Sequence, residues 1–235
     1  MMERFLRTEA IIGTDNMQKL SSAKVIVFGI GGVGGHAVDA IARCGVGEIH
    51  LVDCDRVSVT NINRQLIADD STVGTLKTDA FEEHLKCINP HIKIVKHNIF
   101  YTHENADSID LSQFSYVVDA IDSVSSKVLL IQRAKSQNVP IISSMGFGNK
   151  LNPLEIQVAD ISKTEVCPLA RTIRRLLRQK GINHLKTVYS KEIPKTPESP
   201  IEDTGKRTVG SVSFVPSAAG LVIASEVIKD ICEIN

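Results

Sequence analysis

The sequence has no tryptophan, and aromatic residues of all kinds make up only 4% of its 235 residues. Stacked aromatic platforms for nucleobases and sugar-binding clefts lined by aromatic rings are therefore not expected. Net charge is also absent, because 27 basic residues balance 27 acidic ones. This balance argues against charge-driven disorder and against a globally basic nucleic-acid binder, although a local basic patch remains compatible with it.

Cysteine is scarce and follows no pairing pattern. The five cysteines are scattered and never spaced as C-x-x-C: Cys44, Cys54, Cys87, Cys167 and Cys232. This pattern excludes a structural zinc site of the usual spacing and argues against a disulfide framework. Reduced thiols are typical of the cytosol, so we expect a cytoplasmic protein.

Long apolar runs are missing too. No uninterrupted run approaches the roughly 20 residues that a membrane-spanning helix needs. The amino terminus is charged throughout and lacks the apolar centre of a signal peptide. We therefore expect a soluble protein with no membrane partner. With 43% hydrophobic residues, a chain of this length can bury a substantial core as one domain.

Strand and helix patterns alternate over the first 145 residues. Short apolar runs typical of buried strands occur at 24–28, 48–52, 92–95, 116–120 and 140–143. Helical patterns occur at 3–21, with a break at 13–15, from the glycine cluster to 44, at 75–88 and at 123–137. Because such alternation favours parallel βαβ units, we predict an α/β fold with a doubly wound, mostly parallel, Rossmann-like sheet.

The last third of the chain is less regular. An edge strand is predicted at 154–158, a helix at 168–180 and a closing helix at 217–231, whereas 191–208 carries three prolines and many charges and is predicted to be a loop. The whole chain, 1–235, is then a single domain. We predict a nucleotide-binding core over 1–160 and an irregular extension over 161–235.

A glycine cluster lies between the first predicted strand and its helix. In GIGGVGG, Gly29, Gly31 and Gly34 form G-x-G-x-x-G. Glycines allow a tight turn and close approach to phosphate, and a helix amino terminus carries partial positive charge. Asp53 follows the second strand, where a carboxylate would meet ribose hydroxyls. One alternative is a glycine turn that binds no ligand. If the strand, glycine loop and helix do bind a nucleotide, their default function is that of a dinucleotide-dependent dehydrogenase.

Polar residues after the second strand favour a triphosphate instead. The segment LVDCDRVSVTNINRQ contains Asp53, Asp55, Asn61, Asn63, Arg64 and Gln65. Hydride transfer needs no guanidinium or second carboxylate there. Transfer of an adenylyl group does need them, because negative charge develops on the α-phosphoryl group and on the departing pyrophosphate. Lys77 begins the next helix and could reach phosphate oxygens. Asp119 and Asp122 end the fourth strand, where a carboxylate suits Mg²⁺.

In this order, these motifs resemble the MoeB/ThiF/HesA superfamily of ubiquitin-activating-type adenylating enzymes over roughly residues 4–160. The segments DAIDSVSSK, NINRQ and PLARTIRRLLR are most similar to the tRNA threonylcarbamoyladenosine dehydratases within it. That resemblance implies a homodimeric enzyme that uses ATP and Mg²⁺ to activate the threonyl carboxylate of threonylcarbamoyladenosine in tRNA as an acyl-adenylate, which then cyclises. It also allows a Na⁺ or K⁺ ion near the site and a sulfur-relay protein as a partner.

The resemblance also implies individual roles. The nucleotide-binding set is Gly29, Gly31, Gly32, Gly34, Asp53, Asp55, Asn61, Arg64, Gln65, Lys77 and Asp122. Within this set Asp53 would bind ribose, Asn61 and Arg64 the triphosphate and Lys77 a phosphate. Asp122 would hold Mg²⁺. Catalysis would involve Arg64, Lys77 and Asp122, with Arg7 reaching the ATP of the partner subunit.

Plainer interpretations stay open for several residues. Asp55 could cap a turn, and Arg7 and Lys127, which matches a lysine common among the dehydratases, could simply be solvated. Cys167, before a helix, could be an activated thiol or a small buried apolar residue. On that helix Arg171, Arg174, Arg175 and Arg178 share one face, either as a polyanion-binding stripe or as a solvated surface.

Three other functions stay open beside the dehydratase. One is adenylation of a sulfur-carrier or ubiquitin-like protein, which uses the same nucleotide motifs but is opposed by the missing C-x-x-C pairs. Another is a nicotinamide oxidoreductase, which has no use for the cluster at 61–65. A non-enzymatic Rossmann-like binding module is the last.

Overall fold

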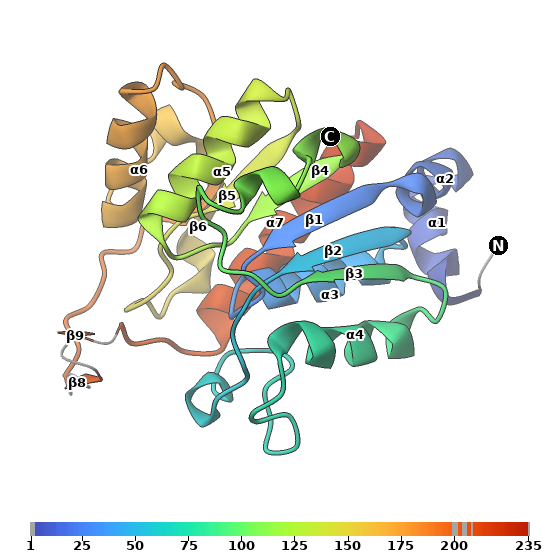
Figure 1. The fold of residues 1–235 in the computed structure, drawn as a ribbon, viewed down its shortest axis with the longest axis horizontal. Coiled ribbons are helices and arrows are strands. Elements are labelled where there is room, and N and C mark those ends of the chain that lie inside the picture. The colour runs from blue at the N-terminus through green and yellow to red at the C-terminus, as the bar shows by residue number, and fades with distance from the viewer. Residues whose placement is uncertain (1–2, 199–201, 204–205, 208, 235) are drawn as a thin grey trace.

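The computed structural model describes residues 3–198, 202–203, 206–207 and 209–234. Seven strands form one sheet in the order β3-β2-β1-β4-β5-β7-β6 (Figure 1). The strands are β1 Lys24–Phe28, β2 Glu48–Val52, β3 Lys93–His97, β4 Tyr116–Asp119, β5 Ile141–Ser144, β6 Ile156–Asp160 and β7 Lys186–Ser190. All neighbours are parallel except β6 and β7, which are antiparallel. The predicted doubly wound, mostly parallel α/β sheet is therefore confirmed.

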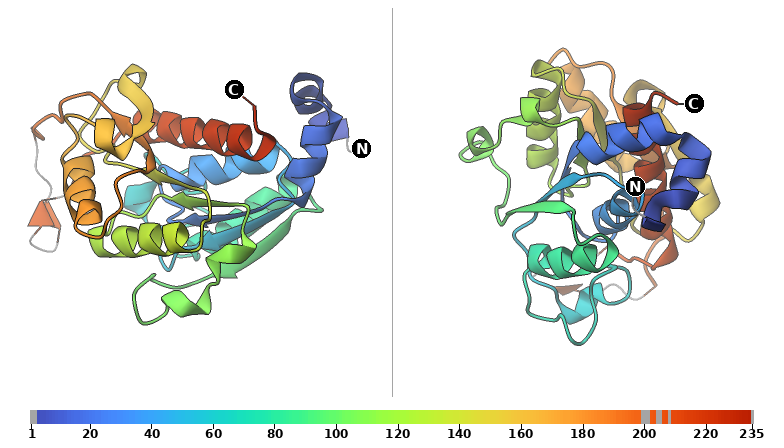
Figure 2. Two further views of the ribbon diagram at one scale, coloured as in Figure 1. Left: turned by 90° about the horizontal axis from the view of Figure 1, so that it is seen from above. Right: turned by 90° about the vertical axis from the view of Figure 1, so that its right-hand side faces the viewer.

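Helices cover both faces of the sheet, as the two views of Figure 2 show. The α-helices are α1 Leu6–Ile12, α2 Thr14–Ser22, α3 Gly34–Arg43, α4 Lys77–Ile88, α5 Val124–Ser136, α6 Pro168–Arg178 and α7 Phe214–Cys232. One core layer is built from α2, α3, α4 and α7, and the opposite layer from α5 and α6. The break between α1 and α2 falls at Gly13, as predicted.

The central strand β1 shows why both faces are buried. Val25 and Val27 contribute to the core layer with α3 and α7, whereas Ile26 and Phe28 contribute to the layer with α5. Successive side chains of a strand point to opposite faces, so a strand covered on both sides needs an unbroken apolar run. The residues VIVF, which follow the partly buried Lys24, meet that need.

The carboxyl-terminal third contains a strand, β7, that was not predicted from the sequence. This strand lies between β5 and β6, and β6 is the edge strand that was predicted. Residues after 160 therefore contribute a strand to the main sheet, and α7 packs against α3. The functional division of the chain at residue 160 stays a prediction.

The segment 191–208 was predicted to be a loop without regular elements, and this is wrong in one respect. Glu202–Asp203 (β8) and Lys206–Arg207 (β9) form a short antiparallel pair. Residues 199–201, 204–205 and 208 of that segment lie outside the described residues. Among the helices of the described ranges, none has the length and apolar composition needed to cross a membrane.

Candidate functional site

A cleft of about 830 Å³ opens at the carboxyl ends of β1, β2, β4 and β5. Open parallel sheets bind their ligands at this edge. Of the residues predicted to bind nucleotide, the cleft wall includes Gly29, Gly31, Gly32, Asp53, Asp55, Asn61, Arg64, Gln65, Lys77 and Asp122. Gly34 and Arg7 do not line it. The fold thus gathers residues spread over nearly a hundred positions into one site.

The glycine loop joins β1 to α3 in a conformation that other residues would not accept. Gly29 has φ of +80°, and a Cβ there would lie 2.7 Å from the carbonyl oxygen of Ala120. A Cβ on Gly34, the first residue of α3, would lie 1.8 Å from the carbonyl oxygen of Gly29. Gly34 therefore acts by letting the helix start close against the loop. The helix amino terminus consequently faces the cleft, where it favours an anion.

Asp53 fastens this loop to the end of β2. One carboxylate oxygen accepts from the backbone N–H of Ile30 at 3.0 Å, and the other accepts from the N–H of Asp55 at 2.9 Å. The carboxylate thus orders both the glycine loop and the segment that follows β2. A ribose contact for Asp53 stays a prediction beside this positioning role.

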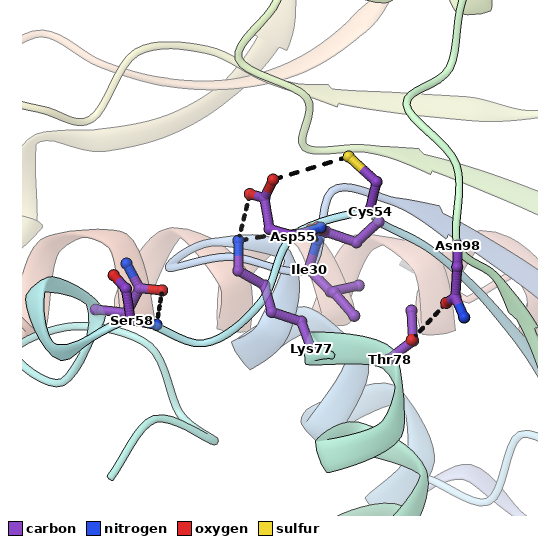
Figure 3. Close-up of polar contacts among 9 residues, drawn as sticks. Ile30, Cys54, Asp55, Ser58, Lys77, Thr78 and Asn98 are labelled. Atoms are coloured by element: carbon purple, nitrogen blue, oxygen red, sulfur yellow. Dashed lines mark hydrogen bonds and ion pairs between the residues drawn. The ribbon is translucent and has the colours of Figure 1, made fainter. Parts of the chain in front are cut away.

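Lys77 stands in the cleft wall near two carboxylates, and Figure 3 shows its ammonium directed at that of Asp55. Its Nζ lies 2.7 Å from a carboxylate oxygen of Asp55 and 3.8 Å from one of Asp53. Lys77 is 5% exposed, whereas the Asp55 side chain is 63% exposed. The ion pair with Lys77 gives Asp55 a role in holding the ammonium at the cleft, in addition to any contact with a ligand.

The segment after β2 turns through a short 3-10 helix, η2 Val59–Asn61, that presents the next polar groups. The Asn61 side-chain oxygen accepts from the N–H of Ser58 at 3.1 Å, which closes a capping box. Arg64 lines the cleft, and its guanidinium donates to the carbonyl oxygen of Thr60 at 2.8 Å. Asn61 therefore builds the turn that carries Arg64.

Gln65 is buried against the glycine loop. Its Nε2 would lie 3.6 Å from a Cβ on Gly31. Its side-chain oxygen is buried and accepts no hydrogen bond within the part of the chain that the structure describes. A buried acceptor without a donor is costly, so this oxygen is suited to a donor supplied by a ligand or water.

Lys127 is buried, so its interpretation as a solvated helix residue is wrong. Its Nζ donates to a carboxylate oxygen of Asp119 at 2.8 Å and to the carbonyl oxygen of Ser144 at 3.0 Å. Lys127 and Asp119 are both fully buried. The other Asp119 oxygen accepts from the N–H of Ile121 at 3.2 Å. This pair shapes the strand end that carries Asp122 into the cleft.

Asp122 is exposed in the cleft wall. Its carboxylate is suited to bind a divalent cation whose other ligands are phosphate oxygens and water. No group of three or more His, Cys, Asp or Glu side chains among the described residues could enclose a metal. Mg²⁺ does not need such a cage, because it keeps several waters and is commonly bound by one or two carboxylates and substrate phosphates. The single carboxylate of Asp122 suits that mode.

Two further candidates lie away from open cleft space. Arg7 is exposed on α1, at the opposite end of the sheet from the cleft (Figure 1). Cys167 is 2% exposed, and its Sγ lies 3.7 Å from the position of a Cβ on Gly146. The thiol is therefore buried behind the cleft wall, which fits its interpretation as a small apolar residue.

One further wall of the cleft was not predicted from the sequence. This wall consists of Ser144, Met145, Gly146, Phe147, Gly148, Leu169, Val209, Ser211 and Pro216. Its strand-end segment, SSMGFGN, begins with the last two residues of β5 and contains two glycines. That segment is the signal that could have indicated it. The residues after 160 in this wall come from α6, from the segment before α7 and, for Pro216, from the first turn of α7.

The chain matches the ThiF family over residues 3–235. It is 38% identical over 246 residues to the tRNA threonylcarbamoyladenosine dehydratase of Bacillus subtilis, covering 98% of this chain and 95% of that protein. The Escherichia coli protein of that name is 37% identical, over 84% of this chain and 76% of its own. An adenylyltransferase and sulfurtransferase of Saccharomyces cerevisiae is 33% identical, over 59% of this chain and 31% of its own.

Solved structures agree with these relatives. The Escherichia coli tRNA N6-threonylcarbamoyladenosine dehydratase in complex with AMP superposes with a TM-score of 0.90 at 34% identity, covering 98% of this chain and 94% of that one. The structure of that enzyme in complex with ATP gives a TM-score of 0.88 at 33% identity, with the same coverage. With its site at the carboxyl edge of the sheet and matches along nearly its whole length, this chain belongs to the ThiF family.

Proposed function

We propose that this protein is an ATP-dependent tRNA threonylcarbamoyladenosine dehydratase. The observation that carries the proposal is the meeting of the glycine loop, Arg64, Lys77 and Asp122 in one cleft. Relatives that match nearly the whole chain bear that name, and one was solved with ATP. The sulfurtransferase relative matches a smaller part of the chain.

The reaction is a dehydration driven by ATP. An oxygen of the threonyl carboxylate attacks the α-phosphorus, and the bond from that phosphorus to the bridging oxygen of pyrophosphate breaks. The product is an acyl-adenylate, whose carbonyl carbon is electrophilic. The neighbouring ureido group attacks this carbon, closes a ring and expels AMP. One water is lost from the nucleoside, its oxygen leaving on AMP.

The residues of the cleft divide this work by charge and position. Gly31 and Gly32 let the phosphates approach the backbone and the amino terminus of α3. The cations of Arg64 and Lys77 stabilise negative charge that develops on the phosphoryl oxygens. Asp53 binds the ribose and keeps the glycine loop in place, and Asp55 keeps Lys77 at the cleft.

Asp122 holds Mg²⁺ in this proposal. The ion, when bound, supplies positive charge against the triphosphate. The exposed position of Asp122 at the end of β4 supports this role, because a carboxylate there faces the same cleft as Lys77.

Assembly as a homodimer follows from the proposed role of Arg7. This residue lies on α1, beyond the amino ends of the strands, so it cannot reach the cleft of its own chain. A second copy could bring its Arg7 to this cleft. The substrate tRNA and ATP are both found in the cytoplasm, where we place the enzyme.

The decisive experiment is mass spectrometry of nucleosides from tRNA incubated with the protein and ATP. Loss of one water from threonylcarbamoyladenosine, with AMP and pyrophosphate formed, is the expected result. Unchanged nucleosides, together with pyrophosphate exchange that depends on a carrier protein ending in Gly-Gly, would overturn the proposal in favour of carrier activation.

A further inference from the structure

Helix α6 carries arginines that the cleft chemistry does not use. Arg171, Arg175 and Arg178 are exposed along one side of this helix. With Arg174 and Gln179 they surround a surface hollow of about 510 Å³. Since α6 contains no acidic residue, its surface is strongly positive over this stretch although the whole chain has no net charge.

Arg174 differs from its three neighbours. Its guanidinium donates to the carbonyl oxygens of Ile161 and Thr164, at 3.2 Å and 2.7 Å, and to the Thr164 hydroxyl at 2.7 Å. It is half-buried and fastens α6 to the turn that precedes it. The four arginines lie around one hollow, as their spacing predicts, but the bonds to Ile161 and Thr164 make Arg174 neither a solvated side chain nor a free cation.

The other three arginines have no partner among the residues that the structure describes. Arg171 and Arg175 are four positions apart, and Arg175 and Arg178 three, so their charges repel one another along the helix. This arrangement costs stability in the free protein unless an anion neutralises it. A surface that is to bind a polyanion requires this kind of unpaired charge.

The position of α6 connects this surface to the cleft. Leu169, in the first turn of α6, lines the cleft wall. At 1.5 Å of rise per residue, Arg171 lies about 3 Å farther along the helix axis and Arg178 about 14 Å farther. The three guanidiniums therefore extend outward from the reaction site on one rigid element.

We infer that Arg171, Arg175 and Arg178 bind the phosphate backbone of the substrate tRNA beside the nucleotide that enters the cleft. This inference rests on the proposed function. A tRNA nucleotide that enters the cleft brings the phosphates of its neighbours close to these arginines on α6. Arginine suits this contact, because it binds phosphate through paired N–H donors. An acidic protein would fit the charge alone, without any need to lie so close to the cleft.

The test compares two variants that each remove two cations from the last turns of helices. Arg175→Gln with Arg178→Gln alters the α6 surface. Lys86→Gln with Lys135→Gln, in the last turns of α4 and α5, is the matched control. The dissociation constant for tRNA containing threonylcarbamoyladenosine is measured from low to physiological salt, together with ATP affinity, kcat, KM and the oligomeric state.

For the α6 variant we expect a dissociation constant raised about tenfold at low salt, and a salt dependence flattened by about two phosphate contacts. KM for tRNA should rise while ATP affinity, kcat and the oligomeric state remain those of the control. If the α6 variant keeps the tRNA affinity and salt dependence of an active wild-type enzyme, the inference is refuted and the proposed function stands. A wild-type protein that leaves the nucleoside unchanged would instead refute the proposed function.

If the α6 variant binds tRNA normally but dissociates into smaller species or loses an acidic protein partner, the surface is a protein interface and the inference is wrong.

Discussion

Lys127 and Asp119 show what a single buried pair contributes to the site. Both side chains are excluded from solvent, and Asp119 also accepts from the Ser143 hydroxyl at 2.5 Å. Removing two charges from water is costly, and their attraction offsets the cost only while both partners are present. Because Asp119 also accepts from the N–H of Ile121, the pair connects strand stability to the position of Asp122.

We predict that Lys127→Met lowers the free energy of unfolding by about 3–5 kcal/mol, because it leaves a buried carboxylate without its cation. Urea denaturation measures the change. The double variant Lys127→Met with Asp119→Asn removes both charges and should be clearly more stable than the single variant. Equal loss in both variants would show that the pair contributes through packing and not through charge.

Asp122 has the opposite character, an exposed carboxylate that fold stability does not need. Asp122→Ala should reduce tRNA-dependent pyrophosphate exchange by at least about a hundredfold, a loss of about 3 kcal/mol of transition-state stabilisation, and leave the melting temperature unchanged. Asp70→Ala, at another exposed aspartate outside the cleft, is the control. If Asp122→Ala exchanges pyrophosphate as fast as the control variant, Asp122 has no role in adenylate formation.

At the residue scale, the sequence predicted which polar groups gather but not what they do for one another. The strand-end positions of Asp53 and Asp55 were enough to place them at one edge of a parallel sheet. The ion pair between Lys77 and Asp55 joins residues 22 positions apart, and that between Lys127 and Asp119 depends on how α5 packs. Such contacts require the three-dimensional structure.

Among the elements, β2 and β3 bring two histidines together. His50 and His97 lie with ring nitrogens 2.9 Å apart, and the other His50 nitrogen lies 2.8 Å from a Glu48 oxygen. Burial lowers the pKa of both rings, and the nearby His50 lowers that of His97 further, whereas Glu48 partly opposes the effect on His50. Folding therefore favours the neutral form of both side chains.

The sign of the pH dependence follows from these lowered pKa values. Below about pH 6.5, the ordinary pKa of histidine, the unfolded chain binds more protons at these positions than the folded chain. Stability should then fall as the pH drops from 7 towards 5.5. Urea denaturation at pH 7 and at pH 5.5 measures this loss of unfolding free energy, which should be smaller in the double variant His50→Gln with His97→Gln. The same loss in the variant and the wild type would assign this pH dependence to other groups.

Elements with an unbroken apolar run were predictable, and β7 shows the limit. In β1 the buried residues from Val25 to Phe28 are all apolar, whereas β7 has the sequence KTVYS. Thr187 is fully buried, and its hydroxyl donates to the carbonyl oxygen of Ala159 at 2.7 Å on the neighbouring edge strand. A polar residue satisfied by a distant partner gives no apolar signal in the sequence.

At the scale of the whole molecule, the parallel sheet separates two ends with different roles. The cleft lies where β1, β2, β4 and β5 end. The opposite end is covered by α2, where the N–H of Gly47 donates to the carbonyl oxygen of Leu20 at 3.1 Å. Since α1 precedes α2 there, Arg7 and the cleft of one chain are at opposite ends of the sheet. A role for both in one reaction requires two chains.

Mixing subunits tests this arrangement. If Arg7 acts in the partner's cleft, Arg7→Ala and Asp122→Ala homodimers should each be inactive. A mixed dimer then contains one cleft with an intact Asp122 that also receives an intact Arg7 from the partner. After equilibration of equal amounts, half of the dimers are mixed and each has one working site of two, so about a quarter of wild-type activity should return. No recovery, with subunit exchange verified by mass spectrometry of differently labelled chains, would place Arg7 outside the partner's site.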